Sequence, residues 1–170
     1  MDLWCWFKEL LAFCDFIGLE LLALKSADSS SVHKSGNYNP DKAIDNDIEN
    51  TFHSLTSPAD MNPWLQIELE YVANVDHVII YNRKDCCGER MKNVALRVGL
   101  TKFTKGMELQ NDETCAIYDG PGSDGEKIII SCSREMKGQY VSIHRMENTP
   151  AILNLNEIMI YGHAGKGLCS

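Results

Sequence analysis

Residues 83–90, Arg-Lys-Asp-Cys-Cys-Gly-Glu-Arg, place two guanidinium groups, two carboxylates and two adjacent cysteines close together in the chain. Each arginine carries a planar fork of N–H donors that can span two hydroxyl groups or a carboxylate. Asp85 and Glu89 are near enough in sequence to orient these forks. The combination predicts a ligand-binding site, whereas the alternative interpretation is an ordinary solvated turn.

The neighbouring cysteines restrict what this loop can do. Adjacent Cα atoms lie ~3.8 Å apart across a trans peptide, while an ordinary disulfide spans ~4.4 to 6.8 Å. A Cys86–Cys87 bridge would therefore close a small, rigid ring. It would enclose no chain and add little loop-closure stability, so its role would be local, in shape or chemistry. The alternative is that each cysteine pairs elsewhere or remains free.

Composition limits the class of partner. The chain has 170 residues and a formal net charge of -8, which argues against duplex nucleic acid or an anionic membrane held by general charge. A neutral ligand or a cation fits better. Seven cysteines favour an oxidising compartment and therefore a secreted, extracellular protein.

The chain divides into three parts. Residues 1–21 are apolar and aromatic, but charges at Asp2, Lys8, Glu9 and Asp15 interrupt any secretory signal or membrane span. We interpret this part as an appendage or atypical leader that does not insert into membranes. The domain is expected at 22–162 and a flexible tail at 163–170. Cys5 and Cys14 would lie outside the disulfide framework, while Cys169 could bond another chain, which leaves a homo-oligomer possible.

Short β-rich runs separated by turn signals predict an all-β antiparallel sandwich of about eight strands. The expected strands are 64–69, 77–81, 94–99, 114–118, 127–132, 139–144, 153–155 and 158–161. In the first of them, Leu65, Ile67 and Leu69 alternate with polar or aromatic residues and should face the core.

No motif for nucleotide binding or catalysis occurs in the sequence context that such a site requires. Residues 120–125 match G-x-G-x-x-G, but a strand is expected after them rather than a helix, so we predict a hairpin loop. The five histidines show no zinc-site spacing, and no nucleophile elbow or plausible catalytic carboxylate pair occurs. The protein is not expected to be an enzyme.

The longer pattern Asn82-Arg83-x-Asp85-Cys86-Cys87-Gly88-Glu89-Arg90 resembles the signature of the fucolectins, or F-type lectins. Ala43-Ile44-Asp45, Asn62-Pro63-Trp64 and Glu157-Ile158-x-Ile160-x-Gly162 extend the resemblance over the domain. It implies a jelly-roll fold of the discoidin-like superfamily and fucosylated glycans as ligands. Arg83 and Arg90 would donate to α-L-fucose, Asp85 would orient Arg83, and a Cys86–Cys87 disulfide would pack against the sugar.

The resemblance also implies a bound calcium ion. Its ligands would be the carbonyl groups of Lys42 and Ser54 together with Asp45, Asp47, Asn156 and Glu157. A Cys115–Cys132 disulfide is implied as well. From the residues alone, those two cysteines stand on the arms of one expected hairpin and could form either a bridge or a free-thiol pair.

Two departures from the family pattern concern the same loop. Where the family has a sugar-binding histidine, counting back from Asn62 gives Thr56, with His53 three residues earlier. Either residue could complete the pocket. Ser54 and Asn156 also occupy the positions of a family disulfide. The alternative function is therefore an adhesion module of the discoidin type that lacks fucose specificity. A thiol-disulfide protein is disfavoured because no C-x-x-C motif is present.

Overall fold

The computed structural model describes residues 18–34, 36–56, 58–103, 112–147 and 149–165. The chain in these ranges is almost entirely β-structure, in eleven strand segments. They are β1 (Glu20–Leu21), β2 (Leu24–Ser29), β3 (Phe52–His53), β4 (Asp60–Met61), β5 (Trp64–Tyr81), β6 (Val94–Gly99), β7 (Glu113–Tyr118), β8 (Lys127–Arg145), β9 (Pro150–Ala151), β10 (Asn154–Leu155) and β11 (Glu157–Ala164). Two short 3-10 helices, η1 (Pro40–Ala43) and η2 (Gly88–Arg90), complete the described structure. Neither approaches the length of a bilayer crossing, and no other helix occurs among the described residues.

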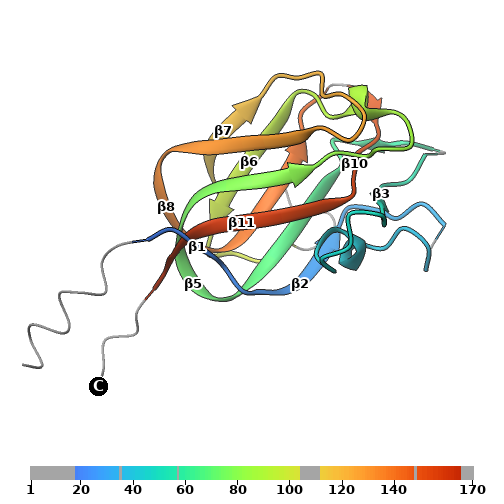
Figure 1. The fold of residues 1–170 in the computed structure, drawn as a ribbon. Helices are drawn as coiled ribbons and strands as arrows, with labels where there is room; N and C mark the ends of the chain where they lie inside the picture. Colours follow the sequence, from blue (N-terminus) through green and yellow to red (C-terminus); the bar gives the residue numbers. More distant parts are fainter. Residues whose placement is uncertain (1–17, 35, 57, 104–111, 148, 166–170) are drawn as a thin grey trace, which may run out of the picture.

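One antiparallel sheet, ordered β1-β11-β5-β8-β6-β7 with β2 also paired to β5, forms the sandwich (Figure 1). The long strands β5 and β8 pair along both of their halves. Residues 64–68 pair with 140–144, and residues 77–81 pair with 127–131. Register shifts separate these two stretches, and such irregularities bend a strand. β5 and β8 therefore carry the chain from one layer of the sandwich to the other, which confirms the predicted antiparallel architecture.

The expected strand boundaries need correction at these bends. The sequence predicts separate strands at 64–69 and 77–81, and again at 127–132 and 139–144, whereas each pair is one continuous strand. The polar stretches between them remain hydrogen-bonded, since residues 73–75 pair with 136–138. Sheet pairing also extends two residues beyond each expected domain boundary, to Glu20 and Ala164. Residues 1–17 and 166–170, with Cys5, Cys14 and Cys169, lie outside the described residues.

The core lies between the layers and follows the predicted alternation. Leu65, Ile67 and Leu69 are completely buried, as expected from the pattern. Residues with the same two-residue spacing join them in the core from the second half of β5, from β8 and from β11, including Val78, Ile80, Ile128, Ile130, Ile158 and Ile160. Burying one such side chain contributes roughly 1.5–3 kcal/mol. This core makes the sandwich a rigid support for its loops.

The predicted disulfide between Cys115 and Cys132 is present, with its Cα atoms 4.5 Å apart. It joins β7 to the first half of β8. These two segments share no ladder hydrogen bonds in the described sheet order. The bond therefore ties together two strands that backbone pairing leaves unconnected.

The outer face of β5 is also covered, which the alternating pattern does not predict. Gln66 is 2% exposed, and its side-chain carbonyl accepts a hydrogen bond from the Phe103 backbone N–H. The Trp64 ring packs edge-on against the Phe103 ring, with centroids 6.0 Å apart. His144, whose strand position pairs with Trp64, is half-buried here. Burial and the nearby Arg97 cation lower the pKa of His144 to about 4.

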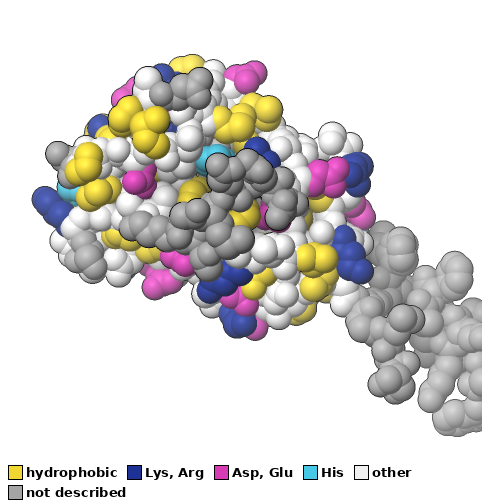
Figure 2. Space-filling model, turned by 180° about the vertical axis from the view of Figure 1, so that it is seen from behind, with side chains coloured by type: hydrophobic (Ala, Val, Ile, Leu, Met, Phe, Trp, Pro, Cys, Tyr) yellow, Lys and Arg dark blue, Asp and Glu magenta, His cyan; other side chains and the backbone are white. Residues whose placement is uncertain are grey.

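Several short strands and turns gather at one end of the sandwich. In Figure 1, β3, β10 and the turns beside them lie at the right, whereas β1 and the end of β11 lie at the left. Figure 2 shows the molecule from behind, where the described hydrophobic side chains form separate groups among charged ones.

Acidification should destabilise the fold through His144. Its ordinary pKa is about 6.5 in an unfolded chain, so between pH 6.5 and 4 only the unfolded state binds this proton. The free energy of unfolding should therefore fall as pH drops through that window, by up to about 1.4 kcal/mol per pH unit. Urea titrations of wild type and His144→Gln check this. An unchanged pH slope in the variant would contradict it.

Candidate functional site

The loop after β5 is held in place by the side chain of Asn82, which is 1% exposed. Its Nδ2 donates to the carbonyl oxygens of Gly88, at 2.9 Å, and Ser123, at 2.8 Å. Its Oδ1 accepts from the Arg83 N–H at 2.9 Å. One amide thus fixes the beginning and the end of the loop, and also joins it to residues 120–126.

The loop at 120–126 forms a second brace. Asp124 Oδ1 accepts a hydrogen bond from the Gly88 N–H at 2.7 Å. A Cβ atom at Gly88 would lie 2.4 Å from the Ser123 carbonyl carbon, so only glycine allows this approach. Residues 120–125 are a loop between β7 and β8, as predicted. The predicted hairpin is wrong, because β6 lies between these two strands in the sheet. Their role as a support for residues 82–90 was not predicted.

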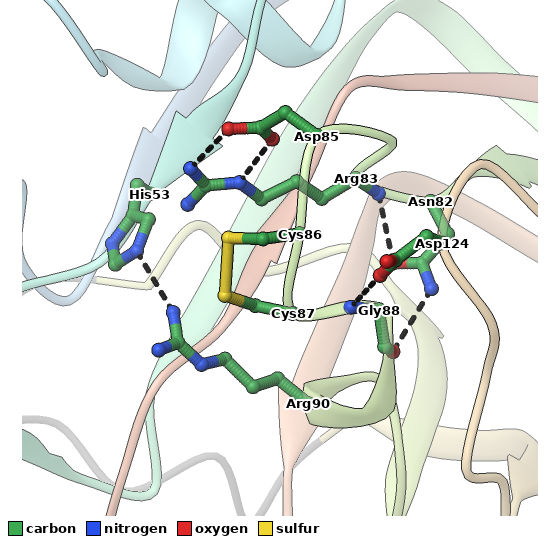
Figure 3. Close-up of a disulfide and its surroundings, with 9 residues drawn as sticks. All are labelled: His53, Asn82, Arg83, Asp85, Cys86, Cys87, Gly88, Arg90 and Asp124. Carbon is green, nitrogen blue, oxygen red and sulfur yellow. Dashed lines mark hydrogen bonds and ion pairs between the residues drawn. A yellow bond between two sulfur atoms is a disulfide. The ribbon is translucent and has the colours of Figure 1, made fainter.

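Cys86 and Cys87 form a disulfide, with their Cα atoms 3.8 Å apart. Cys87 adopts a left-handed backbone conformation, with φ 68°, which is uncommon outside glycine. The bond lies between the Arg83 and Arg90 side chains (Figure 3). The predicted vicinal pair is therefore present, and both sulfur atoms lie at the centre of the candidate site.

Arg83 is oriented by Asp85, as predicted. Its Nε and one terminal nitrogen donate to the two carboxylate oxygens of Asp85, at 2.6 and 2.8 Å. This paired arrangement lowers the pKa of Asp85 to about 2, so the carboxylate is ionised at neutral pH. The Arg83 side chain is only 14% exposed, against 62% for Asp85. The ion pair holds the guanidinium plane in one orientation.

His53 faces Arg90 from β3 (Figure 3). Its Nδ1 lies 2.6 Å from the Ser54 carbonyl oxygen, which can only accept, so Nδ1 carries the proton. Its Nε2 then accepts from Arg90 at 3.3 Å. Burial lowers the pKa of His53, and the Arg83 and Arg90 cations act in the same direction. His53 is therefore a neutral acceptor at physiological pH.

Of the two residues expected to complete the pocket, the structure brings His53 to the arginines. The Thr56 hydroxyl instead lies 3.0 Å from Nδ1 of His33. His33 and Tyr38 pack their rings around His53, with centroid distances of 5.2 and 5.8 Å. Sequence reasoning missed both residues, because they precede the site by many positions and belong to no motif.

Of the expected calcium ligands, Asp45 and Asp47 belong to one turn, with Asn46 between them in a left-handed conformation. Asp45 and Asp47 are bridged by the Asn50 amide, which donates to each carboxylate at 2.9 Å. Asn156 accepts from the Thr51 hydroxyl at 2.9 Å.

Glu157 reaches the same turn from β11. It is 1% exposed, burial raises its pKa to about 7, and its Oε2 has no hydrogen-bond partner among the described residues. The donors are all oxygen atoms, which suits calcium, and an unpartnered buried carboxylate oxygen is a suitable cation ligand.

The geometry limits how a cation would be held there. Within the described ranges, no three His, Cys, Asp or Glu side chains converge closely enough to hold a metal. A calcium ion would therefore depend on backbone and amide oxygens for much of its coordination. Of the expected carbonyl ligands, the Ser54 carbonyl oxygen already accepts a hydrogen bond from His53. A carbonyl oxygen has two lone pairs, so one of them remains for a cation. Lys42 lies in η1, and its Nζ is 3.5 Å from the Asp45 carboxylate.

Known proteins resemble this chain in sequence. Residues 42–143 match the family model described as the NedA-like, galactose-binding domain. A fucolectin of Anguilla anguilla is 32% identical over 122 residues, covering 70% of this chain and 74% of that protein. Fucolectin-4 of Anguilla japonica is 29% identical over 131 residues, covering 74% of this chain and 71% of that protein.

A solved structure supports the fold. The fucolectin from striped bass (Morone saxatilis) serum superposes with a TM-score of 0.71 at 23% identity, over 82% of this chain and 47% of that one. The present chain thus spans about half the length of the striped-bass protein. The likeness confirms the predicted discoidin-like sandwich.

Removing the Asn82 amide should destabilise the protein. Asn82→Ala removes one of two donors from each of the Gly88 and Ser123 carbonyl groups, which keep the Met91 and Glu126 N–H groups, and takes the acceptor from the Arg83 N–H. The expected cost is roughly 1–3 kcal/mol. Urea unfolding measures the loss. Asn37→Ala, at an exposed position in a neighbouring loop, is the matched control and should stay within about 0.5 kcal/mol of wild type. Equal stabilities for the two variants would show that the brace contributes nothing.

Proposed function

We propose, from the premise that this chain belongs to the fucolectin family of galactose-binding-like domains, that it is a lectin recognising terminal α-L-fucose on glycans. The families concerned contain lectins and carbohydrate-binding modules rather than enzymes. The observation that carries the proposal is the convergence of Arg83, Arg90 and neutral His53 around the Cys86–Cys87 disulfide.

The polar groups suit a ligand with several neighbouring hydroxyls. A sugar hydroxyl can accept hydrogen bonds from both arginines and donate one hydrogen of its own. His53 Nε2 is an acceptor directed at Arg90. A hydroxyl placed between them would accept from Arg90 and donate to His53, replacing one weak contact by two. Bonds to a charged donor contribute roughly 1.5–3 kcal/mol each.

The disulfide supplies the apolar part of the site. It lies between the two guanidinium groups (Figure 3), so a ligand held by both arginines must rest against its sulfur atoms. Fucose is a 6-deoxy sugar, and its methyl group gives it an apolar edge. This match between a flat sulfur surface and a methyl-bearing edge favours fucose over a fully hydroxylated hexose.

We further propose that calcium stabilises the turn formed by Asp45 and Asp47. The unpartnered Glu157 oxygen and the all-oxygen donor set support it. Bound calcium would place a positive charge next to the buried carboxylate of Glu157. The proposed location is extracellular, because two disulfides are typical of proteins exposed to an oxidising environment.

Arg83→Ala and Arg90→Ala should each abolish binding of free fucose in calorimetry, because each removes charge-assisted donors worth roughly 1.5–3 kcal/mol. Arg→Lys should fail at either position, since an ammonium group cannot present the planar fork. His53→Ala should weaken binding about ten-fold, the equivalent of one hydrogen bond.

Thr56→Ala provides the control, because the structure places its hydroxyl on His33 rather than on the arginines. Wild-type affinity in both Arg→Ala variants would refute the site. A glycan array led by galactose would refute the specificity but leave carbohydrate binding intact. A profile with no glycan preference and retained cell adhesion would favour the adhesion module.

Calcium should raise the melting temperature of the wild type, because a ligand that binds only the native state stabilises it by mass action. Combining Asp45→Ala with Glu157→Ala should remove this rise. Thermal melts with calcium and with chelator measure the effect, and the Asn37→Ala protein serves as the control. Identical melting curves for the wild type in both conditions would disprove the calcium proposal.

A further inference from the structure

The two disulfides of the structure differ in how far a dissolved reagent can reach them. Cys115 is 2% exposed and belongs to the core between the layers. Cys86 and Cys87 are both partly exposed, and their bond lies between the two arginine side chains of the candidate site (Figure 3). A reagent that enters this site therefore meets the sulfur atoms of the vicinal pair, whereas the core encloses Cys115.

The charges around the vicinal pair favour attack by a thiol. A disulfide is opened by a thiolate anion, and the sulfur atom that leaves also carries a negative charge. Arg83 is already paired with the Asp85 carboxylate. Arg90 instead has neutral His53 as its side-chain partner among the described residues. Since a nearby cation stabilises a cysteine thiolate, the uncompensated charge of Arg90 should speed the opening of this bond.

Opening the bond would leave the fold in place. The two cysteines are neighbours in the chain, so the bond closes no loop and contributes little to stability. The Asn82 amide and the Asp124 carboxylate hold Gly88 through hydrogen bonds that do not involve sulfur. These braces would therefore keep the end of the loop in position after reduction.

The sugar site would nevertheless change. Two sulfur atoms that are no longer bonded repel each other at bonding distance, so at least one cysteine side chain must rotate. Cys87 has a left-handed φ of 68°, which is uncommon outside glycine, and without the bond it can relax toward an ordinary conformation. Its carbonyl oxygen accepts a hydrogen bond from the Arg90 N–H at 3.2 Å. The relaxation would thus disturb Arg90 as well as the sulfur surface.

We propose that the Cys86–Cys87 disulfide is a thiol-exchange site, at which a small dithiol reversibly switches off sugar binding. One thiolate of the dithiol attacks a sulfur atom of the bond and forms a mixed disulfide, and the other cysteine leaves as a thiolate. The second thiol of the reagent then displaces the first cysteine. Two protons pass from the dithiol to the cysteines, so the reagent ends as a disulfide and the protein as two thiols. The inference rests on the proposed function for its consequence, since the exchange itself requires no sugar.

The first test follows the exchange without a sugar. Thiols already present are blocked, the protein is treated with dithiothreitol for increasing times, and newly formed thiols are alkylated and located by mass spectrometry. The vicinal pair should be labelled at least about ten-fold faster than the Cys115–Cys132 pair. Arg90→Gln should slow the labelling of the vicinal pair several-fold, because the cation is lost. Lys137→Gln, at an exposed position on β8, should keep the wild-type rate.

The second test measures fucose binding by calorimetry before treatment, after reduction of the vicinal pair, and after reoxidation with oxidised glutathione. Reduction should weaken binding at least about ten-fold, and reoxidation should restore it. The double variant Cys86→Ser and Cys87→Ser should bind as weakly as the reduced protein and should not respond to the dithiol. Circular dichroism establishes that each protein is folded.

The outcomes separate this inference from the proposed function. Earlier labelling of the Cys115–Cys132 pair, or an unchanged rate in Arg90→Gln, would overturn the exchange site. If untreated wild type does not bind fucose, the proposed function is wrong and the switching of sugar binding falls with it, although the labelling rates still decide whether the exchange site exists. If untreated and reduced proteins bind fucose equally, the fucose site stands and the switch is refuted.

Discussion

The buried amide of Asn82 is the constraint on which the binding loop depends. It bonds three backbone groups at once, in Arg83, Gly88 and Ser123. A loop fixed at both ends does not have to be ordered when a ligand arrives, and that ordering is a main cost of association. Arg83 and Arg90 stand at the two ends of the fixed segment. Their separation is therefore set by the fold before any ligand binds.

Much of the fold could be predicted because its strands obey a simple rule. Alternating side chains identified the buried face of β5, and turn residues separated most strands. The bends in β5 and β8 could not be predicted, because polar residues in a continuing strand look the same as those in a turn. The buried outer face at Gln66 was missed for a related reason. A segment containing Phe103, distant in the sequence, covers this face. The alternation of residues within β5 does not predict that contact.

The site was predictable where its residues are contiguous. The functional side chains of residues 83–90 are neighbours in the sequence, so the Arg83–Asp85 pair and the vicinal disulfide could be predicted from it. The choice between His53 and Thr56 required the structure, because counting positions along a loop does not show which side chain faces the arginines. His33, Tyr38 and the 120–126 loop support the site from elsewhere in the chain. Their contribution depends on three-dimensional packing, which cannot be predicted from the spacing of residues in the sequence.

The described ends of the chain, at β1 and β11, lie at the opposite end of the sandwich from the binding loop (Figure 1). Anything attached to those ends would leave the arginines facing outward. Copies tethered side by side would thus present their sites in one direction, toward a common surface. Once one site has engaged such a surface, the next acts at an effective concentration in the millimolar range for short linkers. Weak single contacts would then add up to firm, reversible attachment.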